Sequence, residues 1–145
     1  MAPPILQFHE KENIMLSSDF HDKNLTSIST NNEVLVLGFS ALEWDTRIIL
    51  GGLEKLRVSD FKEGNIISSV RVIDSENFLL NKDHCEKLVR YAYDIDGSGL
   101  INNEKLSLFL KRKIEEVRDG YLIVLEVEPS FGAYVVAVAK SISED

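Results

Sequence analysis

The sequence predicts an α+β fold, with a mostly antiparallel sheet of about five to seven strands and a helix–loop–helix before a C-terminal β-hairpin. Short β-branched runs, bounded by Gly, Asn and Ser, fill much of the first half. Helical spacing of apolar residues appears on both sides of a polar loop at residues 81–118. Two apolar strands flank a Gly/Pro-containing loop near the C-terminus. A chain of 145 residues can build one core, so we expect a single domain at residues 1–145.

The first half contributes most of the expected strands. Its clearest run is Val34-Leu35-Val36-Leu37-Gly38-Phe39, which is too short for a confident helix and is typical of a buried strand. The segments expected to be loop-like are 18–24 and the Ser/Thr/Asn-rich stretch 26–32, and residues 53–60 are expected to form a short helix. The strands predicted here are residues 5–9, 14–17, 34–39, 47–50 and 66–73.

Two amphipathic helices are predicted next. In the first, which begins after Asn81 or Asp83, one face carries Cys85, Leu88, Val89 and Ala92. Cys85 is therefore expected to be a small core residue rather than a nucleophile. The second helix spans residues 104–118, with an apolar stripe on one side and a charged face on the other, and Gly120 ends it.

The C-terminal hairpin has the clearest pattern. Residues 121–127 and 133–139 are predicted strands around a loop at 128–132. Both strands are apolar on both faces for most of their length, so they should be central in the sheet and covered on each side. The tail, residues 141–145, is expected to fray.

Composition narrows the classes of partner. The net charge is −8, with 24 acidic and 16 basic residues, which argues against nucleic acid and anionic membranes as partners. No apolar run approaches the length of a membrane span, and the first residues do not resemble a signal peptide. A single cysteine allows no internal disulfide. These features predict a cytoplasmic protein with a protein partner or a homo-oligomeric state.

One loop carries a specific chemical pattern. Oxygen-bearing residues alternate along it, and Gly99 stands where a sharp turn is needed. This spacing resembles an EF-hand calcium loop, and also the related dockerin repeat, over residues 83–117. The resemblance implies a calcium site formed by Asp94, Asp96, Ser98, the carbonyl of Leu100 and Asn102.

The last position of the loop departs from the family pattern. Lys105 stands where the family has a bidentate Glu, or Asp in dockerins, and an ammonium group cannot ligate a cation. The adjacent Glu104 would point about 100° away on a helix. Three interpretations stay open: a weak calcium site, a degenerate loop in which the Lys105 amine replaces the ion, or an ordinary polar turn.

The leading functional hypothesis is a non-enzymatic protein-interaction or regulatory domain, with the loop as its calcium-responsive or vestigial element. A second hypothesis is a small-ligand-binding or catalytic domain, with a pocket between sheet and helices near Trp44, Tyr91, Tyr93 and Tyr134. No nucleophile–base pair or phosphate loop supports it. A third is a structural subunit of an oligomer that buries the C-terminal hairpin.

If the loop is a true EF-hand relic, Lys105→Glu restores the missing carboxylate and creates or sharply raises calcium affinity. Isothermal titration with calcium measures this. Lys111→Glu makes the same change of charge away from the loop and serves as the control. A Lys105→Glu protein that shows no response to calcium would support the plain-turn interpretation.

Overall fold

A computed structural model describes residues 19–95 and 104–145. Within these residues, eight strands form one antiparallel sheet in the order β4-β7-β6-β5-β1-β2-β3-β8. The strands are β1 (Asn24–Asn31), β2 (Val34–Ala41), β3 (Trp44–Gly51), β4 (Lys55–Ser59), β5 (Asn65–Ile73), β6 (Ile123–Phe131), β7 (Tyr134–Ala139) and β8 (Ser141–Glu144). The helices are the short 3-10 turn η1 (Phe78–Asn81), α2 (Lys82–Ala92) and α3 (Glu104–Arg118).

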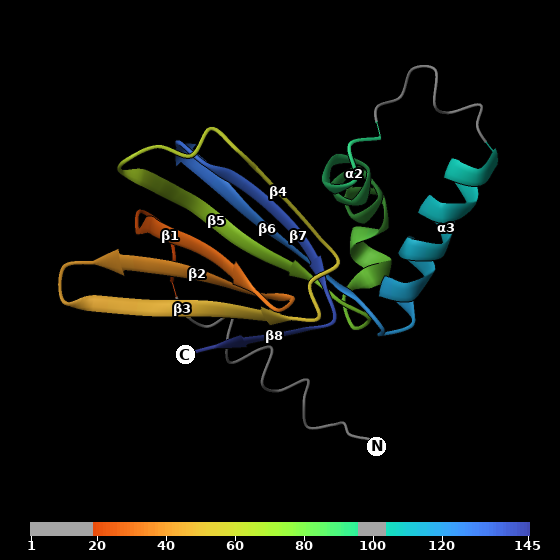
Figure 1. The fold of residues 1–145 in the computed structure, drawn as a ribbon, viewed down its shortest axis with the longest axis horizontal. Coiled ribbons are helices and arrows are strands. Elements are labelled where there is room, and N and C mark those ends of the chain that lie inside the picture. Colours follow the sequence, from red (N-terminus) through yellow and green to blue (C-terminus); the bar gives the residue numbers. More distant parts are fainter. Residues whose placement is uncertain (1–18, 96–103) are drawn as a thin grey trace.

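The sheet consists of two halves that face each other. Strands β4, β7, β6 and β5 form one half, and β1, β2, β3 and β8 form the other (Figure 1). The halves are joined through β1 and β5, which pair only at Asn24 with Ile66 and at Leu25 with Asn65. Apolar side chains from both halves meet in one core, which contains Leu25, Leu35, Leu37, Phe39, Ile48, Leu50, Ile67, Leu125, Val127, Val135 and Ile142. The arrangement is therefore that of two sheet layers packed face to face.

The chain crosses between the halves at two adjacent points. The first lies between β3 and β4, where Gly52 adopts a φ of 63°. The second lies at Lys140 between β7 and β8, and the Lys140 amide donates to the Gly51 carbonyl at 2.9 Å. A Cβ on Gly52 would lie 2.9 Å from the Cβ of Lys140. Only glycine allows the two crossings to approach this closely in that conformation.

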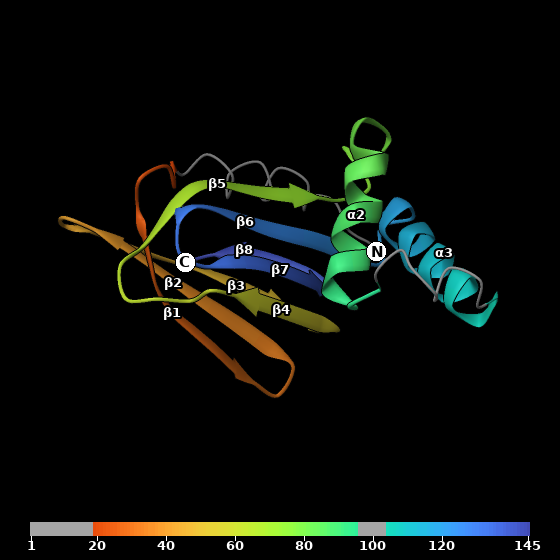
Figure 2. The same cartoon turned by 90° about the horizontal axis from the view of Figure 1, so that it is seen from above.

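Both helices lie at one end of the molecule (Figures 1 and 2). Helix α2 packs on the outer face of β4, β6 and β7, and α3 packs on α2 and η1. A second core fills this layer and contains Ile73, Phe78, Cys85, Leu88, Val89, Leu110, Val117, Val124, Val136 and Val138. Strands β6 and β7 are consequently covered on both faces, as their sequence predicts. None of the described helices has the length and apolar character required to cross a membrane.

The prediction of an α+β fold with five to seven strands was wrong. The described residues form an eight-stranded, sheet-dominated fold. Three strands were missed. The Ser/Thr/Asn-rich stretch predicted to be a connector forms β1, whose Ser and Thr side chains face solvent. The segment predicted to be a short helix contains β4, in which Leu56 and Val58, two residues apart, pack on the core. Strand β8 was taken for a frayed tail, but it pairs with β3 and buries Ile142.

Other predicted elements match the structure. The helix expected at 104–118 is α3, and β2 and β5 contain the strands expected at 34–39 and 66–73. The strands expected at 5–9 and 14–17 lie outside the described residues. Strand β6 runs on to Phe131, so the hairpin loop is shorter than expected and consists of Gly132 and Ala133.

A buried asparagine holds the seam between the halves. Asn65 is fully buried, and its Nδ2 donates to the carbonyls of Leu25, at 3.1 Å, and Lys62. Its Oδ1 accepts from the amides of Lys62, at 2.8 Å, and Ala133, at 3.0 Å. One side chain thus joins β1, the β4–β5 loop and the β6–β7 turn, and it satisfies four backbone groups through two buried and two part-buried hydrogen bonds.

Replacement of Asn65 by Leu should lower the free energy of unfolding by about 3 kcal/mol, because four backbone groups, two of them in buried hydrogen bonds, lose their partner together. Urea denaturation measures the change. Asn31→Leu, at an exposed position of β1, is the matched control and should change stability by less than about 0.5 kcal/mol. Equal effects of the two substitutions would show that the Asn65 bonds do not hold the seam.

Candidate functional site

Helix α2 ends at the start of the predicted calcium loop in a tight cap. The Asp94 amide donates to the Tyr91 carbonyl at 3.1 Å, and the Ile95 amide donates to the Arg90 carbonyl at 2.8 Å. Asp94 has a φ of 58°, in the left-handed region. This is the Schellman pattern, in which Gly usually occupies the left-handed position. Asp is one of the few other residues that tolerate this conformation.

Arg57 of β4 binds this helix end. Its Nη1 donates to the Tyr91 carbonyl at 2.9 Å and to Asp94 Oδ1 at 3.2 Å. The guanidinium also lies over the Tyr91 ring, 4.1 Å from its centre. A cation at a helix C-terminus complements the helix dipole, and here it adds a second hydrogen bond to the Tyr91 carbonyl. The Asp94 carboxylate is therefore engaged with a cationic partner, although its side chain is 82% exposed.

The other predicted calcium ligands, Asp96, Ser98, Leu100 and Asn102, lie outside the described residues. Lys105 lies in the first turn of α3. Arg57 places a positive charge beside Asp94, which opposes a cation at this carboxylate. Across residues 19–95 and 104–145, no cluster of three or more His, Cys, Asp or Glu side chains is arranged to hold a metal. Calcium binding by the loop stays a prediction.

The four aromatic residues proposed to line one pocket do not come together. Trp44 lies on β3 and packs against Phe20, with ring centres 5.8 Å apart, beside the core between the sheet halves. Tyr91 of α2 contacts Tyr134 of β7, and their ring centres are 5.1 Å apart. Tyr93 instead packs against Phe109 of α3. Trp44 is thus separated from the other three by a layer of sheet.

Cys85 is a core residue of α2, as its helical spacing predicts, and is fully buried. Burial, with a smaller effect from the charge of Glu86, raises the pKa of its thiol to about 11. A thiol in this state is protonated at neutral pH and is a poor nucleophile.

The most elaborate polar cluster in the described residues is centred on Glu126 of β6, which is only 4% exposed. Its Oε1 accepts from Arg71 Nη1 and lies 2.8 Å from His84 Nε2. Its Oε2 accepts from the Tyr134 hydroxyl at 2.7 Å. The cluster joins β5, β6, β7 and α2 at the border between the helix-covered and open parts of the sheet face.

The partners of Glu126 stabilise its charged form. Burial, the largest single effect, raises the pKa of this carboxyl, but the hydrogen bonds with His84 and Tyr134 and the electrostatic effects of His84 and Arg71 outweigh it. The net result is a pKa below the ordinary value. Burial and the Glu126 hydrogen bond raise the pKa of the Tyr134 hydroxyl, which therefore remains a donor.

Glu126 was not singled out from the sequence, although a signal was present. It is the one charged residue in the apolar run 121–127. A carboxylate inside a strand covered on both faces requires buried partners. Its partners come from positions as distant as Arg71 and His84, so the pairing itself was not readable from spacing.

A groove lies between the two helices at the end of the molecule. Its volume is about 510 Å³. We call it the α2–α3 groove, and it is lined by Phe78, Leu79, Lys82, Glu86, Arg90, Ser107, Leu110, Lys111, Ile114, Glu115 and Arg118. Phe78 and Leu110 are buried and Ile114 is half-buried, so the floor is apolar.

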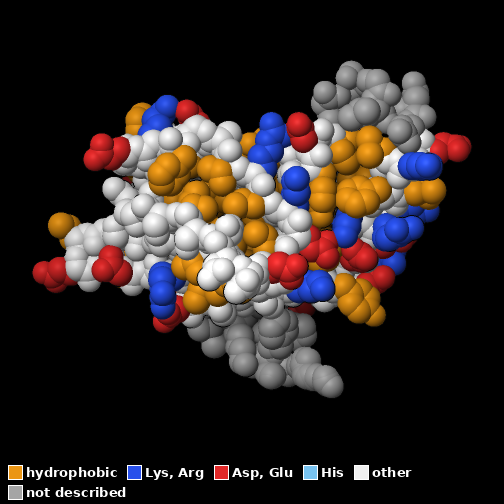
Figure 3. All heavy atoms as spheres, viewed as in Figure 1, with side chains coloured by type: hydrophobic (Ala, Val, Ile, Leu, Met, Phe, Trp, Pro, Cys, Tyr) orange, Lys and Arg blue, Asp and Glu red, His pale blue; other side chains and the backbone are white. Residues whose placement is uncertain are grey.

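Two exposed leucines follow one another in η1. Leu79 lines this groove and is 84% exposed, whereas Leu80 is 91% exposed and lines an adjacent hollow together with Leu79 and Lys82. Figure 3 shows that hydrophobic side chains gather in two areas of the face in view, one over the sheet and one over the helices. The helical end thus combines exposed apolar side chains with a hollow that has an apolar floor.

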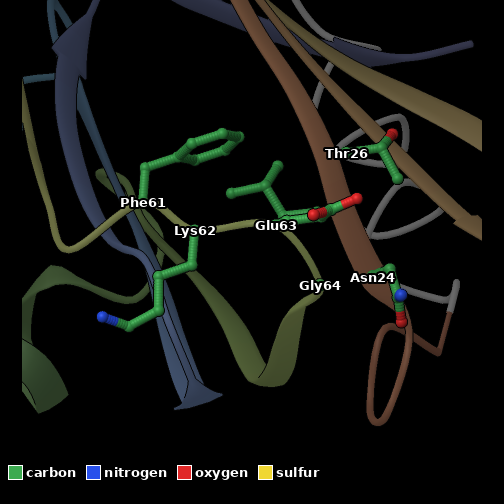
Figure 4. Close-up of a pocket in the computed structure, with 7 residues that line it drawn as sticks. Asn24, Thr26, Phe61, Lys62, Glu63 and Gly64 are labelled. Atoms are coloured by element: carbon green, nitrogen blue, oxygen red, sulfur yellow. The ribbon is translucent and has the colours of Figure 1, made fainter.

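A second hollow, of about 430 Å³, lies at the seam between the sheet halves. Its lining includes Asn24, Thr26, Phe61, Glu63 and Gly64, as Figure 4 shows. The side chain of Lys62 points away from Asn24 and Thr26 in this view, and its amine pairs with Asp60 at 2.7 Å. The side chain of Asn65, next to Gly64, forms its hydrogen bonds with backbone groups of the protein. The carboxylate of Glu63 points toward Asn24 and Thr26 in this view, and all three residues are exposed or half-buried.

The depressed pKa of Glu126 predicts a dependence of stability on pH. The unfolded state holds its proton at higher pH than the folded state, so the stabilisation is present above the unfolded pKa and is lost as pH falls through the folded pKa. We expect Glu126→Gln to lower the free energy of unfolding by about 2 kcal/mol at pH 7 and by much less in acid. Urea denaturation between neutral and acidic pH measures both. Glu128→Gln, at an exposed position on the same strand, should show neither effect.

Comparison with known proteins adds no relationship: no family model, curated protein or solved structure matches the chain. The function is therefore inferred from the surfaces and side-chain arrangements described above.

Proposed function

We propose that this chain is a non-enzymatic protein-interaction domain whose helical end carries the binding surface. The observation that carries the proposal is the pair Leu79 and Leu80, which are 84% and 91% exposed. Leu79 lines the α2–α3 groove, and Leu80 lines the hollow adjacent to it. Burial of one such leucine in an interface is worth about 2 kcal/mol. Adjacent exposed apolar side chains next to a hollow with an apolar floor are typical of protein-binding surfaces.

The arrangement of polar groups favours binding over catalysis. The buried carboxylate of Glu126 has both oxygens engaged by Arg71, His84 and Tyr134. It lines neither the α2–α3 groove nor the hollow at the seam. Its geometry is suited to tying α2 to the sheet, which keeps the binding surface in place.

The C-terminal hairpin is less suitable as an oligomer interface. Residues Val135 to Ala139 of β7 have no exposed surface, because one face packs in the core between the sheet halves and the other packs under α2. The sheet offers a partner no free face along this strand.

The test uses two variants of this chain, one with a photo-reactive amino acid at position 80 and the other with the same amino acid at position 42. Each variant is produced, and cross-linked by light, in the cells that make this chain. Leu42 lies in the β2–β3 turn, at the opposite end of the sheet from the helices (Figure 1), and is 92% exposed. A protein cross-linked only from position 80 is then purified, and its affinity is measured by titration calorimetry.

We expect Leu79→Ser and Leu80→Ser each to weaken this binding by about 10- to 30-fold, because each removes about 2 kcal/mol of apolar burial. Leu42→Ser should leave the affinity unchanged. Cross-linking from position 42 alone, or an affinity insensitive to both η1 substitutions, would refute the proposed surface.

A further inference from the structure

We propose that the α2–α3 groove binds an acidic amphipathic helix of the partner protein. This inference rests on the proposed function and specifies the kind of partner. It follows from the shape of the groove, its apolar floor and the charges on its two walls.

The groove has the shape of a helix-binding channel. The wall from α2 carries Lys82, Glu86 and Arg90, spaced by one helical turn, so it extends about 12 Å, or two turns. The α3 wall carries Ser107, Lys111, Ile114, Glu115 and Arg118 at matching helical spacing. Both walls are helices whose backbone groups are bonded internally, so they offer no strand edge to an extended peptide. A helix can instead place apolar side chains on the floor at i, i+3 or i+4, and i+7.

The floor supplies an apolar contact of suitable size. Phe78 and Leu110 form its buried part, and Ile114 is accessible from the groove. Leu79 stands at the edge, where a bound helix would cover it. A volume of about 510 Å³ holds a few apolar side chains and leaves the polar face of a helix in solvent.

The walls carry a net positive charge in a chain that is strongly negative. Four cations, Lys82, Arg90, Lys111 and Arg118, line the groove against two anions, Glu86 and Glu115, which leaves a net +2, whereas the chain as a whole carries −8. Because the groove is positive while the chain as a whole is negative, the groove favours acidic residues on the partner.

The individual ion pairs show which cations remain for a partner. Arg90 pairs with Glu86 at 3.4 Å, and Arg118 pairs with Asp119 at 2.8 Å. Lys82 and Lys111 form no ion pair with any described residue. They stand on opposite walls, so carboxylates on both flanks of a bound helix have a partner. Two unpaired lysines in so acidic a chain do not make a nucleic-acid site.

The experiment uses the full chain and two labelled peptides of about 15 residues, long enough to form a helix on binding. Both carry Leu at i, i+3 and i+7. One has Glu at the flanking positions and the other has Lys. Fluorescence anisotropy measures their affinities at low and at high salt.

We expect the Glu peptide to bind with micromolar affinity, at least tenfold more tightly than the Lys peptide, and to lose most of this preference at high salt. Substitution of both Lys82 and Lys111 by Glu should reverse the preference. Lys23→Glu with Lys62→Glu, which changes the charge equally at one half-buried and one exposed site away from the helices, should leave it unchanged.

Equal binding of the two peptides, or no binding of either, overturns the acidic-helix inference. The two proposals fail separately. If the Glu peptide does not bind but Leu79→Ser and Leu80→Ser still weaken the cross-linked partner, the interaction function stands and the assigned occupant is wrong. If Leu79→Ser and Leu80→Ser also leave the affinity for the cross-linked partner unchanged, both the proposed function and the acidic-helix inference fail.

Discussion

Strands β6 and β7 determine the architecture, because they are apolar on both faces and must be covered twice. One face is covered by the half of the sheet formed by β1, β2, β3 and β8, and the other by α2. The two crossings at Gly52 and Lys140 allow the chain to pass between the halves at one corner. The helices extend over only one end of the outer face, and Glu126 with its partners occupies the border where this cover stops.

The position of α2 on the outer face of β6 and β7 also explains the α2–α3 groove. Helix α2 is held directly on the sheet, whereas α3 packs on α2 and η1. The amine of Lys113 reaches Glu54 in the β3–β4 connection at 2.6 Å, and the rings of Phe109 and Tyr93 meet at 4.9 Å. These contacts fix α3 along one side of α2 only. The opposite side is left open between the two helices, with Leu110 and Ile114 at its floor.

Periodicity predicted the elements whose burial pattern is simple. The apolar stripe of α3 and the runs in β2, β6 and β7 each have one interpretation, and the structure confirms them. Strands β1, β4 and β8 were missed because their identity depends on pairing with distant segments. Ile142, for example, becomes a core residue only when β8 lies beside β3. Glu126 was missed for the same reason, since its partners come from three other elements.

Asp94 was singled out as a calcium ligand from spacing alone, and its contact with Arg57 of β4 was not readable from the sequence.

The pairing of β3 with β8 has a consequence for the order in which the protein is made. Ile48 pairs with Glu144 and Leu50 with Ile142. Strand β3 can therefore complete its pairing only after residues more than ninety positions later have been synthesised. The layer that covers the inner face of β1, β2 and β3, including Leu35, Leu37 and Phe39, comes from β4 to β7, so this face has no cover until those strands are made. Folding is therefore dominated by non-local contacts and is expected to be slow. The growing chain exposes an apolar sheet during this interval, which makes it a natural client for chaperones during translation.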